Sequence, residues 1–372
     1  MTQKVNIAFF FELLRAGLWG GEVRLLPFEG IDFDEVYVLA REQSVVGLAA
    51  AGLEHIVDKK PTKQQVSRFI GNTLRMEKKN LAMNRFIAKI LTKMREQGIY
   101  TLLVKGQGIA QCYERPLWRA NGDVDLLLDA DNYVKAKAFL EPISTETEPE
   151  SVDALQYCVH VGPWSLELHG TLRCRLSARM DNLIDEVQRD TFAGGNVRTW
   201  KNGDTDVYMP GVDNDIVFIF THFLKHFYKG GLGLRQICDW CRLLWTYRGN
   251  IDVDLLTDRI QRMRLMSEWK AFAAFAVDHI GMPAEAMPLY DASRRWSRKG
   301  RRIKSFILKV GNFGHNRDMS YFEKYPFLIR KTISLWQRLG DICRHALIFP
   351  LDSLRFLHGI MFNGLKAAAK GE

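Results

Sequence analysis

The spacing of apolar residues changes twice along the chain, and this change constrains the fold more than any other feature of the sequence. In residues 32–53 and 62–97, apolar side chains recur at the 3.6-residue period of an amphipathic helix. Thr62 is a suitable N-cap for the second helix, and Gly98 is a suitable stop. We therefore expect a mainly helical N-terminal region over residues 1–98.

In residues 99–210 the apolar residues are grouped in short runs typical of β-strands. Residues 100–104 and 124–128 form two such runs, and residues 157–169 indicate two further strands joined by a turn. Asn202-Gly203 is the turn signal of another hairpin. Short helical stretches lie between these runs, so the sequence predicts an α+β fold with a small mixed sheet as its core.

The helical period returns after residue 210. Residues 211–293 are predicted as one helical region, with apolar helices at 213–229 and 234–247. Residues 294–372 are predicted as a separate, basic and amphipathic helical region. Mainly helical regions therefore flank the mixed module on both sides.

The net charge of +9 comes entirely from the C-terminal region. Residues 294–372 contain 17 Lys and Arg against 5 Asp and Glu, a net charge of +12, whereas residues 1–293 contain 35 against 38, a net charge of −3. Seven of the eleven residues in 294–304 are basic. Such a region can dock on a membrane surface, bind an anionic polymer such as RNA, or form the solvated face of helices that pack on the protein itself.

The overall composition is that of a folded globular protein. Hydrophobic residues make up 47% of the 372 residues and charged residues 26%, close to the average for globular proteins. Six scattered cysteines do not form the dense framework of a small secreted domain, and no apolar run is long enough to span a membrane. We expect a cytoplasmic protein without a transmembrane segment, either free or peripheral to the inner face of the membrane.

Two aspartates placed two residues apart are the most informative feature for function. Asp123 and Asp125 lie in a predicted strand, where alternate residues point to the same face, so both carboxylates face one way. Adjacent carboxylates repel unless a cation lies between them, and hard divalent cations such as Mg²⁺ or Mn²⁺ take oxygen ligands. Glu167, on the polar side of another predicted strand, can supply a third carboxylate. We predict that these three residues bind the metal and are catalytic.

A glycine-containing turn precedes the aspartates. Lys105-Gly106-Gln107-Gly108 follows a predicted strand and opens a short helix, where backbone N–H groups can bind phosphate. Lys105 and Arg119 are candidate cationic partners of the phosphates. We expect nucleotide and phosphate contacts from Lys105, Gly106, Gln107, Gly108 and Arg119.

Histidines and cysteines further along the chain allow more than one interpretation. His222, His226, Cys238 and Cys241 have the spacing of a reversed zinc-ligand set, but they lie in apolar helical stretches where such residues more often pack in the core. His169 shares the polar face of its strand with the predicted third carboxylate. It either orients a metal ligand, contacts substrate, or is a half-buried histidine with a hydrogen-bond partner.

The order of these motifs resembles a known family, the bacterial nucleotidyltransferases of the DNA polymerase beta superfamily. The resemblance rests on the segment LLVKGQGIAQCYERPLWRANGDVDLLLD, the strand LELH and the segment THFLKHFYKGGLGLRQICDW, and it extends over roughly residues 1–250. It implies a minimal nucleotidyltransferase core with the two aspartates and the glutamate at the metal and the glycine turn beside the triphosphate. It also implies that the later helical pair covers the cleft, with Arg235 and Asp239 as an ion pair or substrate contacts. The candidate substrate contacts are His169, His222, His226, Arg235 and Asp239.

We therefore expect a metal-dependent nucleotidyltransferase. It would move a nucleoside monophosphate from an NTP to an unidentified acceptor (a small molecule, saccharide, RNA or protein) and release pyrophosphate. Many members of the superfamily carry a hydroxyl residue in the glycine turn, whereas Gln107-Gly108 supplies none. This departure keeps a second hypothesis open, a non-catalytic protein of the same fold that docks on a membrane surface or an anionic polymer through residues 294–372.

Overall fold

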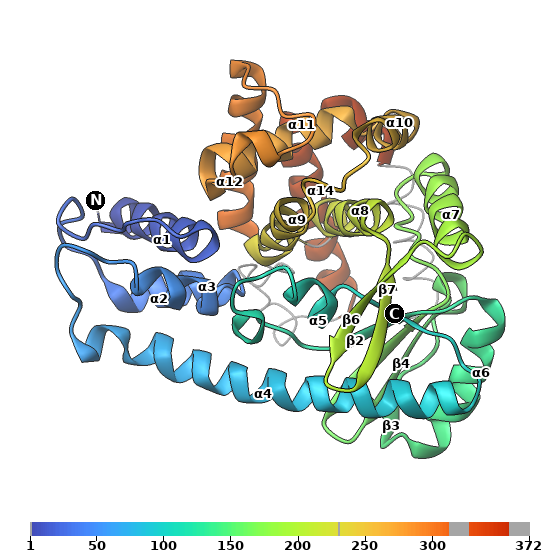
Figure 1. The fold of residues 1–372 in the computed structure, drawn as a ribbon. Coiled ribbons are helices and arrows are strands. Elements are labelled where there is room, and N and C mark those ends of the chain that lie inside the picture. Colours follow the sequence, from blue (N-terminus) through green and yellow to red (C-terminus); the bar gives the residue numbers. More distant parts are fainter. Residues whose placement is uncertain (1, 230, 312–326, 357–372) are drawn as a thin grey trace.

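Helices surround a mixed β-sheet, so the expected α+β class is confirmed (Figure 1). The structure, a computed structural model, describes residues 2–229, 231–311 and 327–356. The predicted basic region is therefore described only in part, because residues 312–326 and 357–372 lie outside the described residues.

The N-terminal region is helical, as predicted. Thr62 caps its longest helix with a capping box in which Gln65 is the partner, and Gly98, with a φ of 66°, follows the last turn. The four helices are α1 Thr2–Trp19, α2 Phe33–Glu42, α3 Val46–Leu53 and α4 Lys63–Glu96.

Residues 32–53 form two helices and not the single helix that the periodicity predicts. Ser44 adopts a left-handed φ of 56°, which ends α2 and redirects the chain into α3. α3 then packs against α1 at very short range. A Cβ on Gly17 would lie 2.0 Å from the carbonyl oxygen of Leu48, so only glycine permits this approach.

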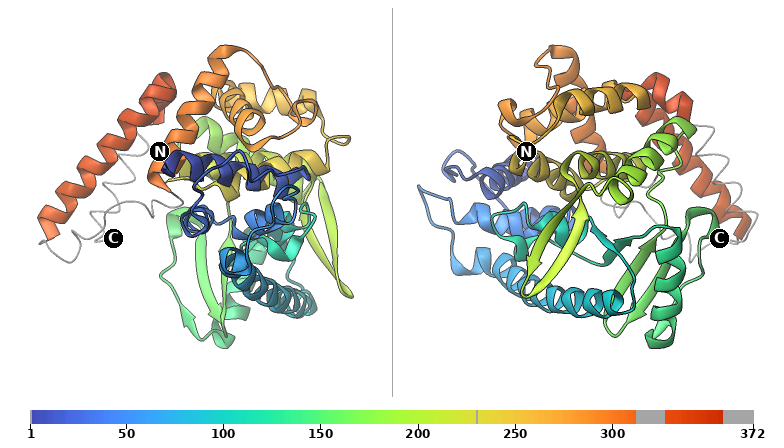
Figure 2. Two further views of the ribbon diagram at one scale, coloured as in Figure 1. Left: turned by 90° about the vertical axis from the view of Figure 1, so that its left-hand side faces the viewer. Right: turned by 45° about the vertical axis from the view of Figure 1, so that its right-hand side comes forward.

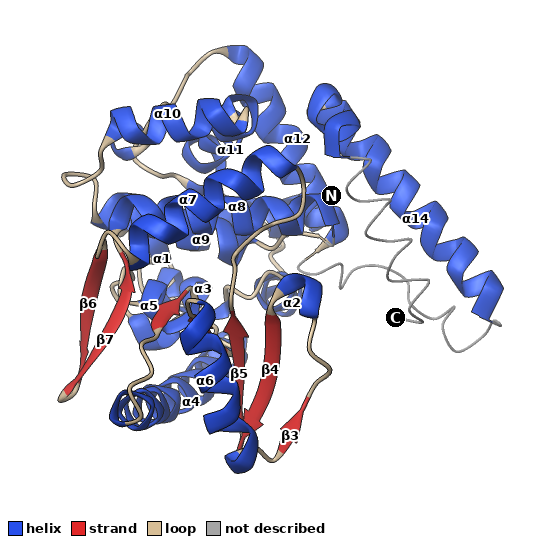
Figure 3. Ribbon diagram, turned by 90° about the vertical axis from the view of Figure 1, so that its right-hand side faces the viewer, coloured by secondary structure: helices blue, strands red, loops and turns tan. Residues whose placement is uncertain are grey.

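The central sheet has five strands in the order β1-β2-β5-β4-β3. β2 pairs in parallel with β5, and the other neighbouring strands are antiparallel. The predicted hairpin, β6–β7, is a separate two-stranded sheet (Figure 3). The strands are β1 Leu102–Val104, β2 Val124–Leu127, β3 Glu146–Thr147, β4 Gln156–Val161, β5 Trp164–His169, β6 Val197–Asn202 and β7 Thr205–Pro210.

The two faces of the sheet differ in chemistry because strand residues alternate. Along β5, Leu166 and Leu168 belong to a buried cluster shared with α4 and with α6 (Ala130–Leu140). Glu167 and His169 point to the opposite face. In Figure 1, α4 crosses the lower part of the sheet, and α8 (Val212–Lys229) and α9 (Leu234–Thr246) lie above the sheet.

The remaining helices build the second half of the molecule. α7 lies in a segment for which the sequence predicted no helix, although Ser177 supplies its N-cap. In Figure 2, α14 lies along the outside of the molecule. In the part of the chain that the structure describes, no helix has the length and apolar composition to cross a membrane. These helices are α5 Gly106–Ala110, α7 Ala178–Phe192, α10 Val253–Met263, α11 Met266–Phe275, α12 Arg294–Val310 and α14 Phe327–Ile348.

α12 contains the basic run, and it packs on the protein itself. Its apolar side chains are buried in the main hydrophobic core, with Phe306 4.9 Å from the ring of Phe227 and 4.7 Å from that of His345. Arg301 and Arg302 lie on its exposed side. In α12, the basic residues are thus the outer face of a core helix.

We predict that Phe306→Ala destabilises the protein by about 3–5 kcal/mol, because it leaves a cavity in an aromatic cluster. Arg301→Ala, on the exposed side of the same helix, should change the free energy of unfolding by no more than about 0.5 kcal/mol. Urea unfolding followed by circular dichroism measures both values. Equal effects of the two substitutions would show that α12 is not part of the core.

Candidate active site

A cavity of about 450 Å³ lies between the polar face of the sheet and helices α8 and α9. Of the predicted site residues, Gln107 and Gly108 do not line this cavity, and all the others do. These lining residues are Lys105, Gly106, Arg119, Asp123, Asp125, Glu167, His169, His222, His226, Arg235 and Asp239. Cys238 and Cys241 do not line the cavity either.

Asp125 is the most deeply buried carboxylate of this cavity, with 4% of its surface exposed. Its Oδ1 lies 2.8 Å from Lys105 Nζ and 2.8 Å from His169 Nε2. Burial alone would raise the pKa of Asp125, but the Lys105 ammonium and the His169 ring bring this pKa well below its ordinary value. Asp125 is therefore ionised at neutral pH.

Lys105 reaches Asp125 through an unusual backbone conformation. Its φ is 56°, in the left-handed region that residues with a side chain rarely adopt. A conformation of this kind costs on the order of 1–3 kcal/mol and persists where surrounding contacts hold it. Here the ion pair with Asp125 is such a contact. Burial lowers the pKa of Lys105, but the carboxylates of Asp125, Glu167 and Asp123 together outweigh this effect, so that the pKa is raised.

Glu167 and Asp123 lie close to Asp125, but neighbouring cations balance their negative charge less well. Asp125 and Glu167 are register partners in the parallel β2–β5 pair, and Glu167 Oε2 accepts a hydrogen bond from Gln156 Nε2 at 3.0 Å. Burial and then repulsion by Asp125 raise the pKa of Glu167 to about 7. The same two causes raise the pKa of Asp123. The three carboxylates together thus carry more negative charge than Lys105 balances.

The residues around Asp125 fit a divalent cation. Ligand atoms of Asp125, Glu167 and His169 lie within 4.8 Å of one another. Carboxylate oxygens suit Mg²⁺ or Mn²⁺, and imidazole is a ligand that Mn²⁺ also accepts. Asp123 lines the same cavity from the residue before β2. The grouping of carboxylate oxygens and an imidazole nitrogen within 4.8 Å of one another is the structural observation that favours a cation here.

Arg119 is bound to Asp239, and this contact was not predicted. Its Nε and Nη2 donate to the two oxygens of Asp239 at 2.7 and 2.6 Å, and Tyr113 Oη donates to the same carboxylate at 2.7 Å. Of the two expected roles of Arg235 and Asp239, the ion pair between them is not formed, because Asp239 pairs with Arg119 and Arg235 turns to a backbone carbonyl; substrate contact stays a prediction. Arg235 donates to the carbonyl oxygen of Ala120 at 2.9 Å. Arg119 thus joins the loop before β2 to α9, which fixes one wall of the cavity.

α8 contributes two lysines that sequence reasoning missed. Lys225 and Lys229 line the cavity together with His222 and His226, and the four residues lie at the i, i+3, i+4, i+7 spacing of one helix face. Burial and the nearby Lys225 lower the pKa of Lys229 to about 8. Burial and Lys105 lower that of Lys225. The helical spacing was visible in the sequence, and attention to all four positions would have identified this basic face.

The two histidines of α8 are neutral. Their Nε2 atoms lie 3.1 Å apart. Burial and neighbouring ammonium groups lower the pKa of His222 well below its ordinary value and that of His226 to about 3. The alternative zinc set is not assembled, because Cys238 and Cys241 are fully buried in the hydrophobic core. The core interpretation of these cysteines agrees with their position.

Packing contacts explain why Gln107 and Gly108 stand in the glycine turn, and the sequence alone did not reveal these contacts. Gln107 is 1% exposed, and its Nε2 donates to Asn80 Oδ1 of α4 at 3.0 Å, away from the cavity. A Cβ on Gly108 would lie 2.8 Å from Met209 Sδ of β7, so glycine permits close packing of the hairpin. Of this turn, Lys105 and Gly106 line the cavity.

We predict that Arg119→Met destabilises the protein by about 3–5 kcal/mol, because it leaves the Asp239 carboxylate buried without a cation. A double variant with Asp239→Leu should cost less than the sum of the two single changes. Arg262, which pairs with Glu186 at 2.5 Å on the surface, is the matched control, and Arg262→Ala should cost at most about 1 kcal/mol. Thermal unfolding of the four variants measures these effects, and additive costs would refute the coupling.

Comparison with known proteins places these residues in a family. A family model described as "uncharacterised nucleotidyltransferase" matches residues 29–279, more than half of the chain. No curated protein and no solved structure matches the chain. The matched segment contains every residue that lines the cavity. The chain therefore belongs to the uncharacterised nucleotidyltransferase family, as its sequence motifs predict.

Proposed function

We propose that this protein is a metal-dependent nucleotidyltransferase that transfers a nucleoside monophosphate from an NTP to an acceptor and releases pyrophosphate. The observation that carries the proposal is the opposition of charges in one cavity. Carboxylates of β2 and β5 lie on its floor, and the ammonium groups of α8 line its wall. A triphosphate with bound cations has the complementary arrangement of charge.

Asp125 and Glu167, with Asp123 and His169 beside them, would hold Mg²⁺ or Mn²⁺. A divalent cation at such a site supplies Lewis acidity for the phosphoryl oxygens. Lys105 neutralises Asp125 and holds its carboxylate in a fixed position. Family membership supports an NTP as the donor.

The basic face of α8 would bind the phosphates. Lys225 and Lys229 line the cavity from α8, and Arg235 lines it from α9. Cationic groups that are already in place stabilise charge developing on the leaving pyrophosphate without further reorganisation. Arg119, held by Asp239, would contribute by positioning this wall.

Glu167 is suited to accept a proton from the acceptor. Without a bound cation, burial and the Asp125 carboxylate raise its pKa to about 7; a cation held beside it would keep Glu167 ionised and able to accept a proton. The hydrogen bond from Gln156 Nε2 fixes the orientation of this carboxylate. An acceptor hydroxyl bound against Glu167 would lose its proton as the new phosphoester bond forms.

Asp125→Asn should abolish metal-dependent binding of NTP and lower transfer by at least about 100- to 1,000-fold, because it removes a charge from the cation site. Thermal shift with each NTP, with and without Mg²⁺, measures binding, and labelled NTP with cell extract measures transfer. Asp131→Asn, an exposed position of α6 outside the cavity, is the control and should behave as wild type.

Two outcomes would contradict this assignment. Transfer at the wild-type rate by Asp125→Asn would show that the cation site takes no part in the reaction. Tight metal-dependent NTP binding by the wild-type protein without transfer to any acceptor would favour the non-catalytic alternative.

The charge of Lys229 gives a pH test of the phosphate site. Because its pKa is about 8, raising the pH from about 7 to about 9 removes a positive charge, so affinity for NTP should fall. The loss of one charge-assisted hydrogen bond, worth about 1.5 kcal/mol, corresponds to a loss of about tenfold in affinity for NTP. Lys229→Arg stays charged and should retain its affinity at the higher pH. Calorimetric titrations at both pH values test this, and the same decline in both proteins would exclude Lys229 as the titrating group.

A further inference from the structure

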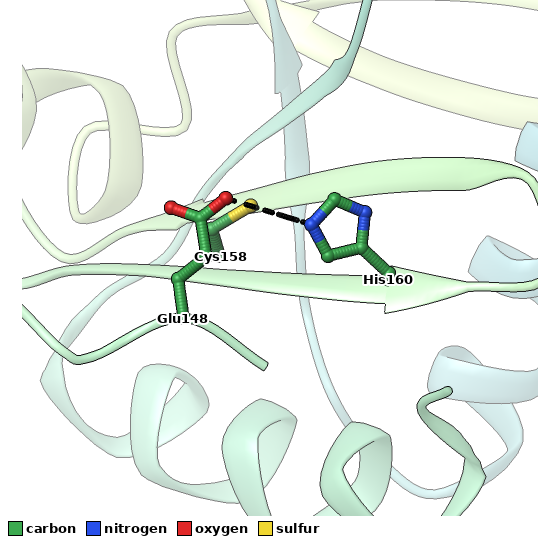
Figure 4. A group of neighbouring side chains, drawn as sticks. All are labelled: Glu148, Cys158 and His160. Carbon is green, nitrogen blue, oxygen red and sulfur yellow. Dashed lines mark hydrogen bonds and ion pairs between the residues drawn. The ribbon is translucent and has the colours of Figure 1, made fainter. Parts of the chain in front are cut away.

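A second group of potential metal ligands lies outside the cavity, at the edge of the sheet. Cys158 and His160 are two residues apart on β4 and therefore share a face, and Glu148 follows β3, which pairs with β4. Figure 4 shows the three side chains converging on one another. None of them lines the candidate active site.

The distances between the ligand atoms are close to those of a metal centre. Cys158 Sγ and His160 Nε2 are 4.0 Å apart, and His160 Nε2 and Glu148 Oε1 are 3.5 Å apart. In a tetrahedral zinc site, with bonds of about 2.0–2.3 Å, such pairs are separated by roughly 3.3–3.6 Å. All three ligand atoms lie within 4.8 Å of one another, so side-chain movements of about an ångström or less would complete the ligand set. Glu148 and His160 are exposed enough to move, with side-chain exposures of 58% and 31%.

The chemistry of the three ligands selects the cation. A thiolate and an imidazole suit borderline cations such as Zn²⁺ and are poor ligands for Mg²⁺ or Ca²⁺. Three protein ligands leave a fourth tetrahedral position for water, and the exposed imidazole and carboxylate give it a path from solvent.

A reactive cysteine is the competing explanation for Cys158. Its side chain is 9% exposed, and its Sγ lies 3.2 Å from Ser165 Oγ. Burial raises the pKa of the Cys158 thiol to about 11, which disfavours the free thiolate that nucleophilic cysteines need. A bound cation, in contrast, would deprotonate a coordinating thiol.

We propose that Cys158 Sγ, His160 Nε2 and a Glu148 carboxylate oxygen bind one Zn²⁺ ion. Binding forms a zinc–sulfur bond and releases the thiol proton to solvent. The ion would join the chain after β3 to β4 and so hold the edge of the sheet. Cys158 is also the register partner of Glu167 in the β4–β5 pair, so the ion would lie next to the strand that carries a candidate catalytic carboxylate. This proposal does not depend on the proposed function.

Titration of the full-length, chelator-treated protein with Co²⁺ tests the site, because a Co²⁺–thiolate bond gives a charge-transfer absorption band. We expect one equivalent of this band in the wild-type protein and its loss on addition of Zn²⁺, which binds such sites more tightly. Asp125, Glu167 and His169 include no sulfur, so metal bound by these three residues does not contribute to the band.

Cys158→Ser should abolish the band, and His160→Gln and Glu148→Gln should weaken cobalt binding by about tenfold or more. Cys343→Ser, which removes an exposed cysteine, is the matched control and should leave the band unchanged. Circular dichroism of each variant without metal separates a lost ligand from a lost fold. A band that is absent from the folded wild-type protein, or that persists in Cys158→Ser, would overturn the proposal.

Discussion

The parallel pairing of β2 with β5 brings Asp125 beside Glu167, and the charge concentrated there governs the surrounding structure. Two carboxylates on adjacent strands under a helical layer repel each other and lose hydration. Lys105 and His169 relieve part of this cost by direct contact with Asp125. The helix packed above the sheet presents lysines and not carboxylates. Lys105, His169 and the lysines of α8 thus direct positive charge or hydrogen-bond donors toward the same two strands.

A second constraint is that the cavity walls come from distant parts of the chain. Arg119 belongs to the loop before β2 and Asp239 to α9, and their paired hydrogen bonds hold loop and helix in one arrangement. A buried ion pair of this kind adds little stability over a well-packed apolar pair, but it is very costly to break. The effect of the Arg119–Asp239 pair is to fix the geometry of the cavity wall. The loop that leads into Asp123 and Asp125 is fixed relative to the helices that cover them.

Much of this architecture was predictable from local signals. The Thr62 N-cap of α4, the turn between β4 and β5 and the Asn202-Gly203 hairpin are properties of neighbouring residues, and the structure has all three where the sequence predicts them. The alternation in β2 and β5 likewise predicted the carboxylate face. Contacts between distant segments were not predictable. The pairing of Arg119 with Asp239 and the packing of Gly108 on β7 depend on which helices and hairpins meet, and no local pattern encodes that.

The position of α12 has a consequence for biosynthesis. The residues matched by the family model end at 279, yet the aromatic cluster around Phe227 also includes Phe306 of the following basic helix and Phe349. A nascent chain emerges from the ribosome N-terminus first, so the sheet and α8 are released before these aromatic neighbours exist. Until α12 has emerged, this apolar surface is open to chaperones and to neighbouring chains. The high charge of α12 then keeps its outer face hydrated while its inner face closes the core.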